Sequence, residues 1–225
     1  MYDVAALGEL LIDFTCLTTD ADGYPTMAAH PGGAPANYLA ALTKFGAKTA
    51  MIGKVGNDAF GRLLIKTLKG AGIGTRGMLV SDDVFTTLAF VTLDDSGDRE
   101  FSVARKPGAD TQLRYDEIDL GVIDASKALH FGTLSMTNEP ARDATYRTVE
   151  YAAGRGKLIS FDPNLRKPLW DDLEEAKRQM LWGLQHADVV KISDEETEFL
   201  FGLAPEAAAK HIIDSFGVRL VYVTC

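Results

Sequence analysis

Two carboxylates, Glu9 and Asp13, lie around the end of the first predicted strand, residues 4–12. Side chains alternate along a strand, so residues four apart project from the same face. Open α/β sheets bind ligands at the carboxyl ends of their strands. A pair of carboxylates at this place predicts either binding of a polyhydroxylated ligand or a plain solvated sheet edge, and the sequence leaves both open.

A glycine pair followed by a helix start forms the next candidate site. Gly32 and Gly33 allow a ligand to approach the backbone closely, and Pro35 suits the first turn of a helix. Asn37 then offers a donor and an acceptor beside the free N–H groups of that turn. The arrangement suits hydroxyl recognition, and a loop-to-helix junction with a cap fits these residues equally well.

Two polar segments follow later predicted strands. In the first, Pro163 fixes the backbone and biases Asp162 to an extended conformation, while Arg166 offers a guanidinium to a phosphate or a carboxylate. In the second, Ser193 precedes Glu196 by three residues, which is the spacing of a helix capping box. A structural role is favoured for Ser193 and Glu196 when they are read singly.

Other familiar motifs lack the context that their chemistry needs. Residues 72–77 match G-x-G-x-x-G but follow a predicted helix and precede a strand, the reverse of a phosphate-binding turn. The chain contains no P-loop motif and no G-x-S-x-G elbow. Four histidines have no metal-ligand spacing, and we expect them to be structural or on the surface: His30, His130, His186 and His211.

Composition narrows the class of protein. The 225 residues include 23 Lys and Arg against 32 Asp and Glu, a formal charge of −9, and 46% are hydrophobic. An acidic chain argues against nucleic acid or an anionic membrane as a partner. Two cysteines, Cys16 and Cys225, are too few for a disulfide scaffold, and no apolar run reaches a membrane span. We expect a reduced, cytoplasmic α/β domain.

Alternating strands and helices must position these residues. Strands are predicted at residues 4–12, 48–55, 128–131, 158–161, 189–192 and 220–224. Helices are predicted at residues 37–44, 58–69, 138–154, 171–184 and 205–216, with Asp58 as an N-cap. This order predicts parallel βαβ units in a doubly wound sheet. Residues 86–93 and 99–103, joined by the polar loop 94–98, break the order and predict an antiparallel hairpin at the sheet edge, a candidate lid.

Taken together, these motifs resemble the ribokinase-like (PfkB) family of carbohydrate kinases. The glycine pair Gly32-Gly33, then Asn37, then Gly46 nine places on, matches the first family signature, with Leu39 as a mild departure where a small residue is preferred. Residues 53–58, the hairpin and residues 162–166 also occur in family order. The resemblance covers the whole chain and is closest to the branch of fructokinases and 2-keto-3-deoxygluconate kinases.

The resemblance implies a role for each motif. The residues that would bind or approach the sugar are Asp13, Gly32, Gly33, Asn37, Arg105 and Arg166. Those that would lie near the ATP phosphates are Asn164, Ser193 and Thr224, with Ser193 standing in place of the family's Asn. Glu196 would order Mg²⁺ through water. The β lid would come from about residues 13–31 and 85–105, and lids of this family often pair subunits into homodimers.

The resemblance also points to a missing part. The family takes its catalytic base and its anion hole from a later Gly-Ala-Gly-Asp motif, and that sequence is absent from the 225 residues. We therefore expect a truncated ribokinase-like domain whose base lies beyond Cys225. The first hypothesis is most of an ATP-dependent sugar kinase, and the second is a non-catalytic sugar-binding or dimerising fragment. Fructose is the first substrate expected, a 2-keto-3-deoxy acid sugar the second, and ribose or a nucleoside the third.

Overall fold

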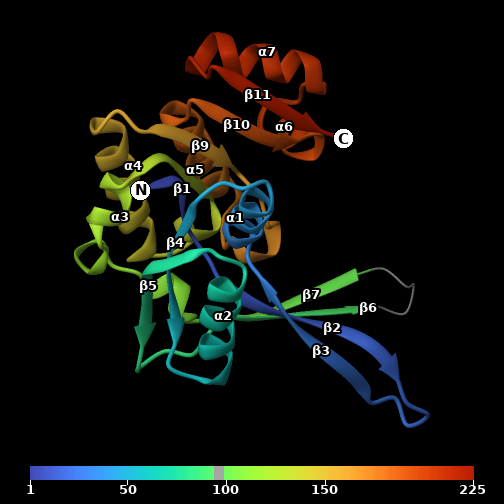
Figure 1. The fold of residues 1–225 in the computed structure, drawn as a ribbon. Coiled ribbons are helices and arrows are strands. Elements are labelled where there is room, and N and C mark those ends of the chain that lie inside the picture. The colour runs from blue at the N-terminus through green and yellow to red at the C-terminus, as the bar shows by residue number, and fades with distance from the viewer. Residues whose placement is uncertain (94–98) are drawn as a thin grey trace.

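A seven-stranded sheet forms the body of the protein in a computed structural model that describes residues 1–93 and 99–225 (Figure 1). Its order is β11-β10-β9-β8-β1-β4-β5, and neighbouring strands run parallel. The strands are β1 (Tyr2–Leu7), β4 (Thr49–Gly56), β5 (Gly74–Ser81), β8 (Ser126–Gly132), β9 (Leu158–Asp162), β10 (Val189–Ser193) and β11 (Leu220–Thr224). Chain order reverses beside β1, which makes this a topological switch point.

Helices cover both faces of this sheet. They are α1 (Ala34–Lys44), α2 (Ala59–Gly70), α3 (Leu120–Asp124), α4 (Ala141–Gly154), α5 (Leu173–His186), α6 (Asp194–Phe201) and α7 (Pro205–Phe216). Successive side chains of β1 point to opposite faces of the sheet and so belong to two hydrophobic cores. Ala6 packs with α1 and α2, while Ala5 and Leu7 pack with α3, α4 and α5. The predicted doubly wound parallel sheet is confirmed. Among the described residues, no helix is both long and apolar enough to cross a membrane.

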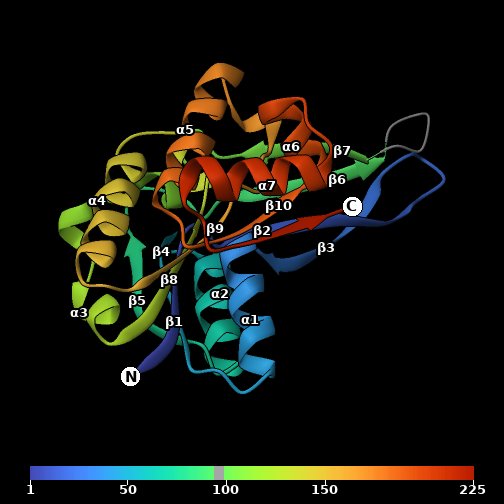
Figure 2. The same ribbon diagram turned by 90° about the horizontal axis from the view of Figure 1, so that it is seen from above.

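A second sheet of four strands stands beside the first. Its order is β3-β2-β6-β7, from β2 (Leu11–Thr19), β3 (Pro25–Gly32), β6 (Leu88–Leu93) and β7 (Arg99–Ala104). It projects on the side where β11 ends, in both ribbon views (Figures 1 and 2). The β6–β7 pair confirms the predicted hairpin, whose loop at residues 94–98 lies outside the described residues. That this small sheet acts as a lid stays a prediction.

The strand predicted at residues 4–12 is wrong as a single element. β1 ends at Leu7, and β2 begins at Leu11 in the other sheet. Gly8 makes the break, because its φ is +156° and a Cβ there would lie 2.6 Å from Cγ of Pro35. Glu9 and Asp13 therefore do not share one strand, and alternation does not place them on one face.

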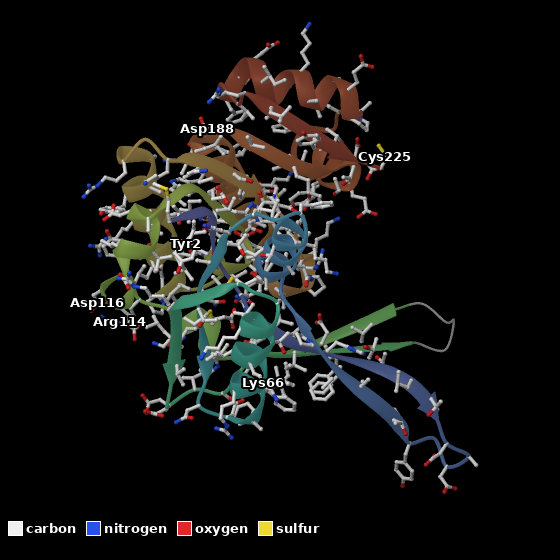
Figure 3. The ribbon with its side chains drawn as sticks, viewed as in Figure 1. Tyr2, Lys66, Arg114, Asp116, Asp188 and Cys225 are labelled. Atoms are coloured by element: carbon white, nitrogen blue, oxygen red, sulfur yellow. The ribbon has the colours of Figure 1, made fainter. Side chains whose placement is uncertain are left out.

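Strand direction defines the edge where ligands are expected. Tyr2 begins β1 and Asp188 directly precedes β10, so both mark the amino edge of the large sheet, whereas Cys225 follows the end of β11 (Figure 3). The carboxyl edge carries Gly132, Asp162, Ser193 and Thr224 at the ends of β8 to β11. The motifs selected from the sequence are thus gathered along one edge.

Candidate functional site

A cavity of about 640 Å³ opens between the small sheet and the loops at the carboxyl edge. This volume falls in the range of small-molecule sites. The described wall from the small sheet includes Asp13, Thr15, His30, Ala89, Val91 and Val103. The opposite wall comes from the segments after β8 and β9 and includes Leu134, Arg166, Pro168 and Leu169. The cavity therefore joins elements that are distant in the sequence.

Strand alternation explains which face of the small sheet meets the cavity. Phe14 points to the other face, where its ring stacks on Phe90 at 5.1 Å and meets the edge of Phe60 of α2 at 5.5 Å. Asp13 consequently points into the cavity. Its register partners, His30 on β3 and Ala89 on β6, share that face. The aromatic contacts hold the sheet to the body and leave its polar face open.

Asp13 and Arg166 are the charged pair that lines this cavity from opposite walls. Burial raises the pKa of the Asp13 carboxyl, and the charges of Arg166 and His30 act in the opposite direction. Gly32 leaves the space that this carboxylate fills, because a Cβ there would lie 2.1 Å from Oδ2 of Asp13. An acceptor and a donor in a largely apolar pocket can orient the hydroxyl groups of a sugar.

Arg105 reaches the same cavity but is bound into the body. Its Nη2 lies 2.7 Å from Oδ2 of Asp110, and the two side chains are 5% and 3% exposed. Its Nη1 donates to Oγ1 of Thr137 at 2.8 Å, and Nη2 donates to the carbonyl of Leu134 at 2.7 Å. We expected Arg105 to bind substrate. All three nitrogens of its guanidinium, however, already have protein partners.

The glycine pair and Asn37 lie at the start of α1. Gly33 has φ +113°, and a Cβ there would lie 2.4 Å from the carbonyl oxygen of Glu9. The buried Glu9 carboxylate accepts a hydrogen bond from the backbone N–H of Ala34 at 2.8 Å, so a distant residue caps this helix. Asn37 lies in the first turn, as predicted, and lines a separate cavity of about 60 Å³ between α1 and α2. Gly32 borders this smaller cavity as well.

The residues expected near phosphate stand along the carboxyl edge. Asn164 has φ +47°, and its N–H donates to Oδ1 of Asp162 at 3.2 Å. Ser193 and Thr224 are register partners at the ends of β10 and β11. Ser193 caps α6, and the predicted capping box with Glu196 is confirmed. The structure thus brings Asn164, Ser193 and Thr224 to one edge, and their part in nucleotide binding stays a prediction.

The Glu196 carboxylate holds two loops together. Its Oε1 accepts from the N–H of Leu165 at 2.6 Å, and its Oε2 accepts from the N–H of Ser193 at 2.8 Å. Each carboxylate oxygen keeps a second lone pair, so this residue fits a contact to Mg²⁺ through water. Within residues 1–93 and 99–225, no group of three or more His, Cys, Asp or Glu side chains is arranged to bind a metal directly.

Sequence reasoning missed Lys191 and Asp110. Nζ of Lys191 lies 3.1 Å from Oδ2 of Asp162, and the lysine side chain is 47% exposed, so it offers a cation at the carboxyl edge. Lys191 could have been found from the sequence, because it interrupts an apolar strand between Val190 and Ile192, both of which are buried. Asp110 had no comparable signal, because its pairing with Arg105 depends on how the chain turns after β7.

His130 fits the structural role expected of the histidines. Burial lowers its pKa to about 3, so it is neutral. Its ring stacks on Tyr38 with centroids 4.0 Å apart, and Nδ1 lies 3.0 Å from Oγ of Ser160. These contacts tie α1 to β8 and β9 beneath the carboxyl edge.

Comparison with known proteins agrees with this geometry. The profile of the pfkB family carbohydrate kinases matches residues 1–225. A relative named probable fructokinase-4, from Arabidopsis thaliana, is 43% identical over 201 residues, which are 88% of this chain and 62% of that protein. The chain therefore spans about three fifths of this relative's length.

Two solved structures share the fold. Fructokinase from Xylella fastidiosa with bound ATP is 30% identical with a TM-score of 0.89, and the match covers 100% of this chain and 69% of that one. Fructokinase from Vibrio cholerae O395, in its fructose-, ADP- and calcium-bound form, is 31% identical with a TM-score of 0.84, over 100% of this chain and 71% of that one. The chain therefore belongs to the pfkB family of carbohydrate kinases.

Proposed function

We propose that this chain provides the sugar-binding part of an ATP-dependent sugar kinase, and that its sugar is fructose. The 640 Å³ cavity carries the proposal, because Asp13 and Arg166 line it from opposite walls at the carboxyl edge of a doubly wound sheet. In this assignment Asp13 accepts hydrogen bonds from sugar hydroxyl groups, and Arg166 donates hydrogen bonds to sugar oxygens. Gly32 and Gly33 shape the loop, whereas Asn37 lines the separate 60 Å³ cavity, so its expected sugar contact rests on the family resemblance alone.

A neutral sugar fits this cavity better than an acid sugar. The described wall carries Asp13, Arg166 and Arg105 together with the titratable His30, and the charge of Arg105 is matched by Asp110 at 2.7 Å. With His30 uncharged, one cation and one anion remain, so a ligand carboxylate would find no excess positive charge. This observation favours fructose over the alternative, a 2-keto-3-deoxy acid sugar.

ATP is the proposed second substrate, with Mg²⁺ as the metal. Asn164, Ser193 and Thr224 would line the phosphate side, and Glu196 would meet the metal through water. The relatives support the pairing, since their structures hold ATP in one case and fructose, ADP and calcium in the other. The first turn of α6 carries Asp194, Glu195 and Glu196, so we place the phosphates beside Asn164 and Lys191 rather than on that helix end. Bound ATP supplies the phosphoryl group.

Phosphoryl transfer needs a base that the family takes from a Gly-Ala-Gly-Asp motif, and the 225 residues lack that motif. We therefore propose that this chain binds sugar without transferring phosphate. The second candidate function is a non-catalytic sugar-binding or dimerising unit. Leu17 and Tyr24 on the β2–β3 hairpin are 62% and 71% exposed, which supports a homodimer through the small sheet.

Calorimetric titration of the 225-residue chain with fructose, glucose and ribose tests the sugar assignment. We expect fructose to bind and Asp13→Asn to weaken it by about tenfold, since a charged hydrogen bond is lost. An Asp83→Asn variant, on an exposed loop, serves as the control. A folded chain that shows no heat with fructose would refute the proposal. Sugar-dependent ADP release by the same chain would instead refute the absence of phosphoryl transfer.

A further inference from the structure

A buried ion pair stands directly at the wall of the large cavity. Arg105 belongs to the described lining, whereas Asp110 does not. Asp110 holds Arg105 by two contacts, from Nε at 2.8 Å and from Nη2 at 2.7 Å. The other oxygen of Asp110 accepts a hydrogen bond from the hydroxyl of Thr87. The carboxylate therefore fixes the guanidinium on the side of the body.

The remaining donors of Arg105 also point into the protein. Nη1 donates to Thr137, and Nη2 donates to the carbonyl of Leu134. Leu134 itself lines the cavity, so the guanidinium is anchored beside the ligand space by groups from the segment after β8 and from the turn after β7. Within this network the cation lies close to the cavity and its charge is cancelled.

Stability alone does not account for the pair. Desolvation offsets much of the attraction within a buried ion pair, and apolar residues of similar volume often serve as well. The pair does have an electrostatic consequence for a ligand. An unmatched Arg105 would attract a carboxylate, whereas a matched one leaves the cavity with the opposite charges of Asp13 and Arg166 beside the titratable His30.

We propose that Asp110 is a specificity-determining residue that makes the cavity select uncharged keto sugars against keto sugar acids. It acts through Arg105, whose charge it cancels and whose guanidinium it turns toward Thr137 and Leu134. The inference rests on the proposed sugar-binding function. It adds that the cavity prefers the uncharged ligand and that Asp110 sets this preference.

The test compares two ligands that differ at one carbon. 2-Keto-D-gluconate is D-fructose with its C1 hydroxymethyl group oxidised to a carboxylate, so the ratio of their dissociation constants isolates the effect of one negative charge. Calorimetric titration of the 225-residue chain should give tighter binding of fructose. In Asp110→Asn, the ratio should move toward the acid by about tenfold, because Arg105 regains a net charge beside the ligand.

Asp171→Asn is the matched control. Asp171 lies 3.4 Å from Lys106, both side chains are 88% exposed, and the pair borders a smaller pocket that shares Arg105 with the large cavity. Removing this carboxylate changes the net charge equally but leaves Arg105 paired, and solvent screens the change. We expect the ratio to stay at the wild-type value. An equal shift in both variants would overturn the proposal.

Arg105→Gln provides a second variant with the opposite expected sign, so either variant tests the proposal where the unpaired buried charge keeps the other from folding. It keeps Asp110 and removes the cation, so the ratio should move away from the acid. An unchanged ratio in a folded variant of either kind would overturn the proposal, as would equal affinity of the wild type for both ligands. If the wild type binds neither ligand, the proposed sugar-binding function fails instead.

Discussion

The cavity beside the small sheet and the carboxyl edge at β9 to β11 use their acidic residues in opposite ways. Behind the cavity wall, Asp110 pairs with Arg105, and Asp13 and Arg166 line the cavity itself. At the edge, Glu196 has both oxygens on backbone N–H groups. If the proposed function holds, a motif carboxylate contacts a ligand in one region and positions a loop in the other.

Glu9 lies between these two regions. It caps α1 after the glycine pair, and it also lines a cavity of about 10 Å³ together with Asp162 and Asn164 at the carboxyl edge. That volume suits a single water molecule. Glu9 is 3% exposed, and burial raises its pKa to about 7. We therefore expect the junction to respond to pH near neutrality.

Glu196→Ala should have the largest effect and separate the two regions. The N–H groups of Leu165 and Ser193 would each lose a charged acceptor, so the free energy of unfolding should fall by about 4 kcal/mol. Urea denaturation measures this loss. Glu195→Ala removes an exposed carboxylate from the same turn and should change stability by less than about 0.5 kcal/mol.

The affinity of Glu196→Ala for fructose tests whether the cavity binds sugar independently of the loops at the carboxyl edge. In folded Glu196→Ala, the loss of fructose affinity should stay below about fivefold, because Glu196 holds Leu165 beside Arg166 while the wall that carries Asp13 is untouched. A large loss of fructose binding in this variant would contradict the division between a ligand-binding cavity and a loop-holding edge.

The second prediction concerns Glu9 and pH. Its pKa is about 7 in the folded chain against an ordinary 4.5, so between these values the unfolded state releases a proton that the folded state keeps. Stability that Glu9 contributes at low pH is therefore lost as pH rises from 4.5 to 7, by about 3 kcal/mol in all. Glu9→Gln lacks this titration and keeps an acceptor for Ala34.

Urea denaturation of both proteins at pH 4.5 and pH 8 gives the measurement. The free energy of unfolding of the wild type, minus that of Glu9→Gln, should be about 3 kcal/mol lower at pH 8. Subtraction removes the titration of groups that the two proteins share. A difference that stays constant with pH would mean that Glu9 is ionised in the fold and that the junction does not respond to pH.

Local signals in the sequence were enough for most of the large sheet. α7 spans residues 205–216 and β11 spans 220–224, as predicted, because Pro205 starts the helix and Gly217, with φ +73°, ends it. The local strand pattern misses β3, because Pro25 and Pro31 are typical of loops; only the family resemblance placed residues of about 13–31 in a β lid. The break at Gly8 was missed because its cause is the approach of Pro35, which is distant in the sequence.

The candidate site was predictable as a set of motifs but not as a set of contacts. The capping box of Ser193 and Glu196 is a local pattern and is confirmed. The second bond of Glu196, to Leu165, joins residues 31 positions apart and has no sequence pattern. The same holds for Arg105, whose partners Asp110, Thr137 and Leu134 come together only when the chain folds.

Gly32→Ala should have a smaller effect than the two stability changes, and it tests the cavity side. The new Cβ would lie 2.1 Å from Oδ2 of Asp13 and must displace that carboxylate. We expect the dissociation constant for fructose to rise by about tenfold, through the loss of a charged hydrogen bond. Gly154→Ala is the control, because a Cβ there meets nothing within 4 Å.

A double-mutant cycle identifies the cause of that loss. If Gly32 only makes room for Asp13, Gly32→Ala should cost little further affinity in an Asp13→Ala background. Additive losses would show that Gly32 contributes to sugar binding by another route, such as close approach of the backbone to the ligand.

The smallest expected effect belongs to Arg166, which is exposed and whose charge keeps the pKa of Asp13 from rising further. Arg166→Met should weaken fructose binding by about fivefold at pH 8, since a partly screened donor is lost. It should also move the acid limb of the binding curve to higher pH, because Asp13 then takes up its proton sooner. Arg166→Lys keeps the charge but not the planar geometry of the guanidinium, so it should weaken binding and leave the acid limb in place. Titrations with fructose from pH 4 to pH 8 separate these outcomes, and an acid limb that is identical in the wild type and both variants would mean that Asp13 and Arg166 do not act on one ligand.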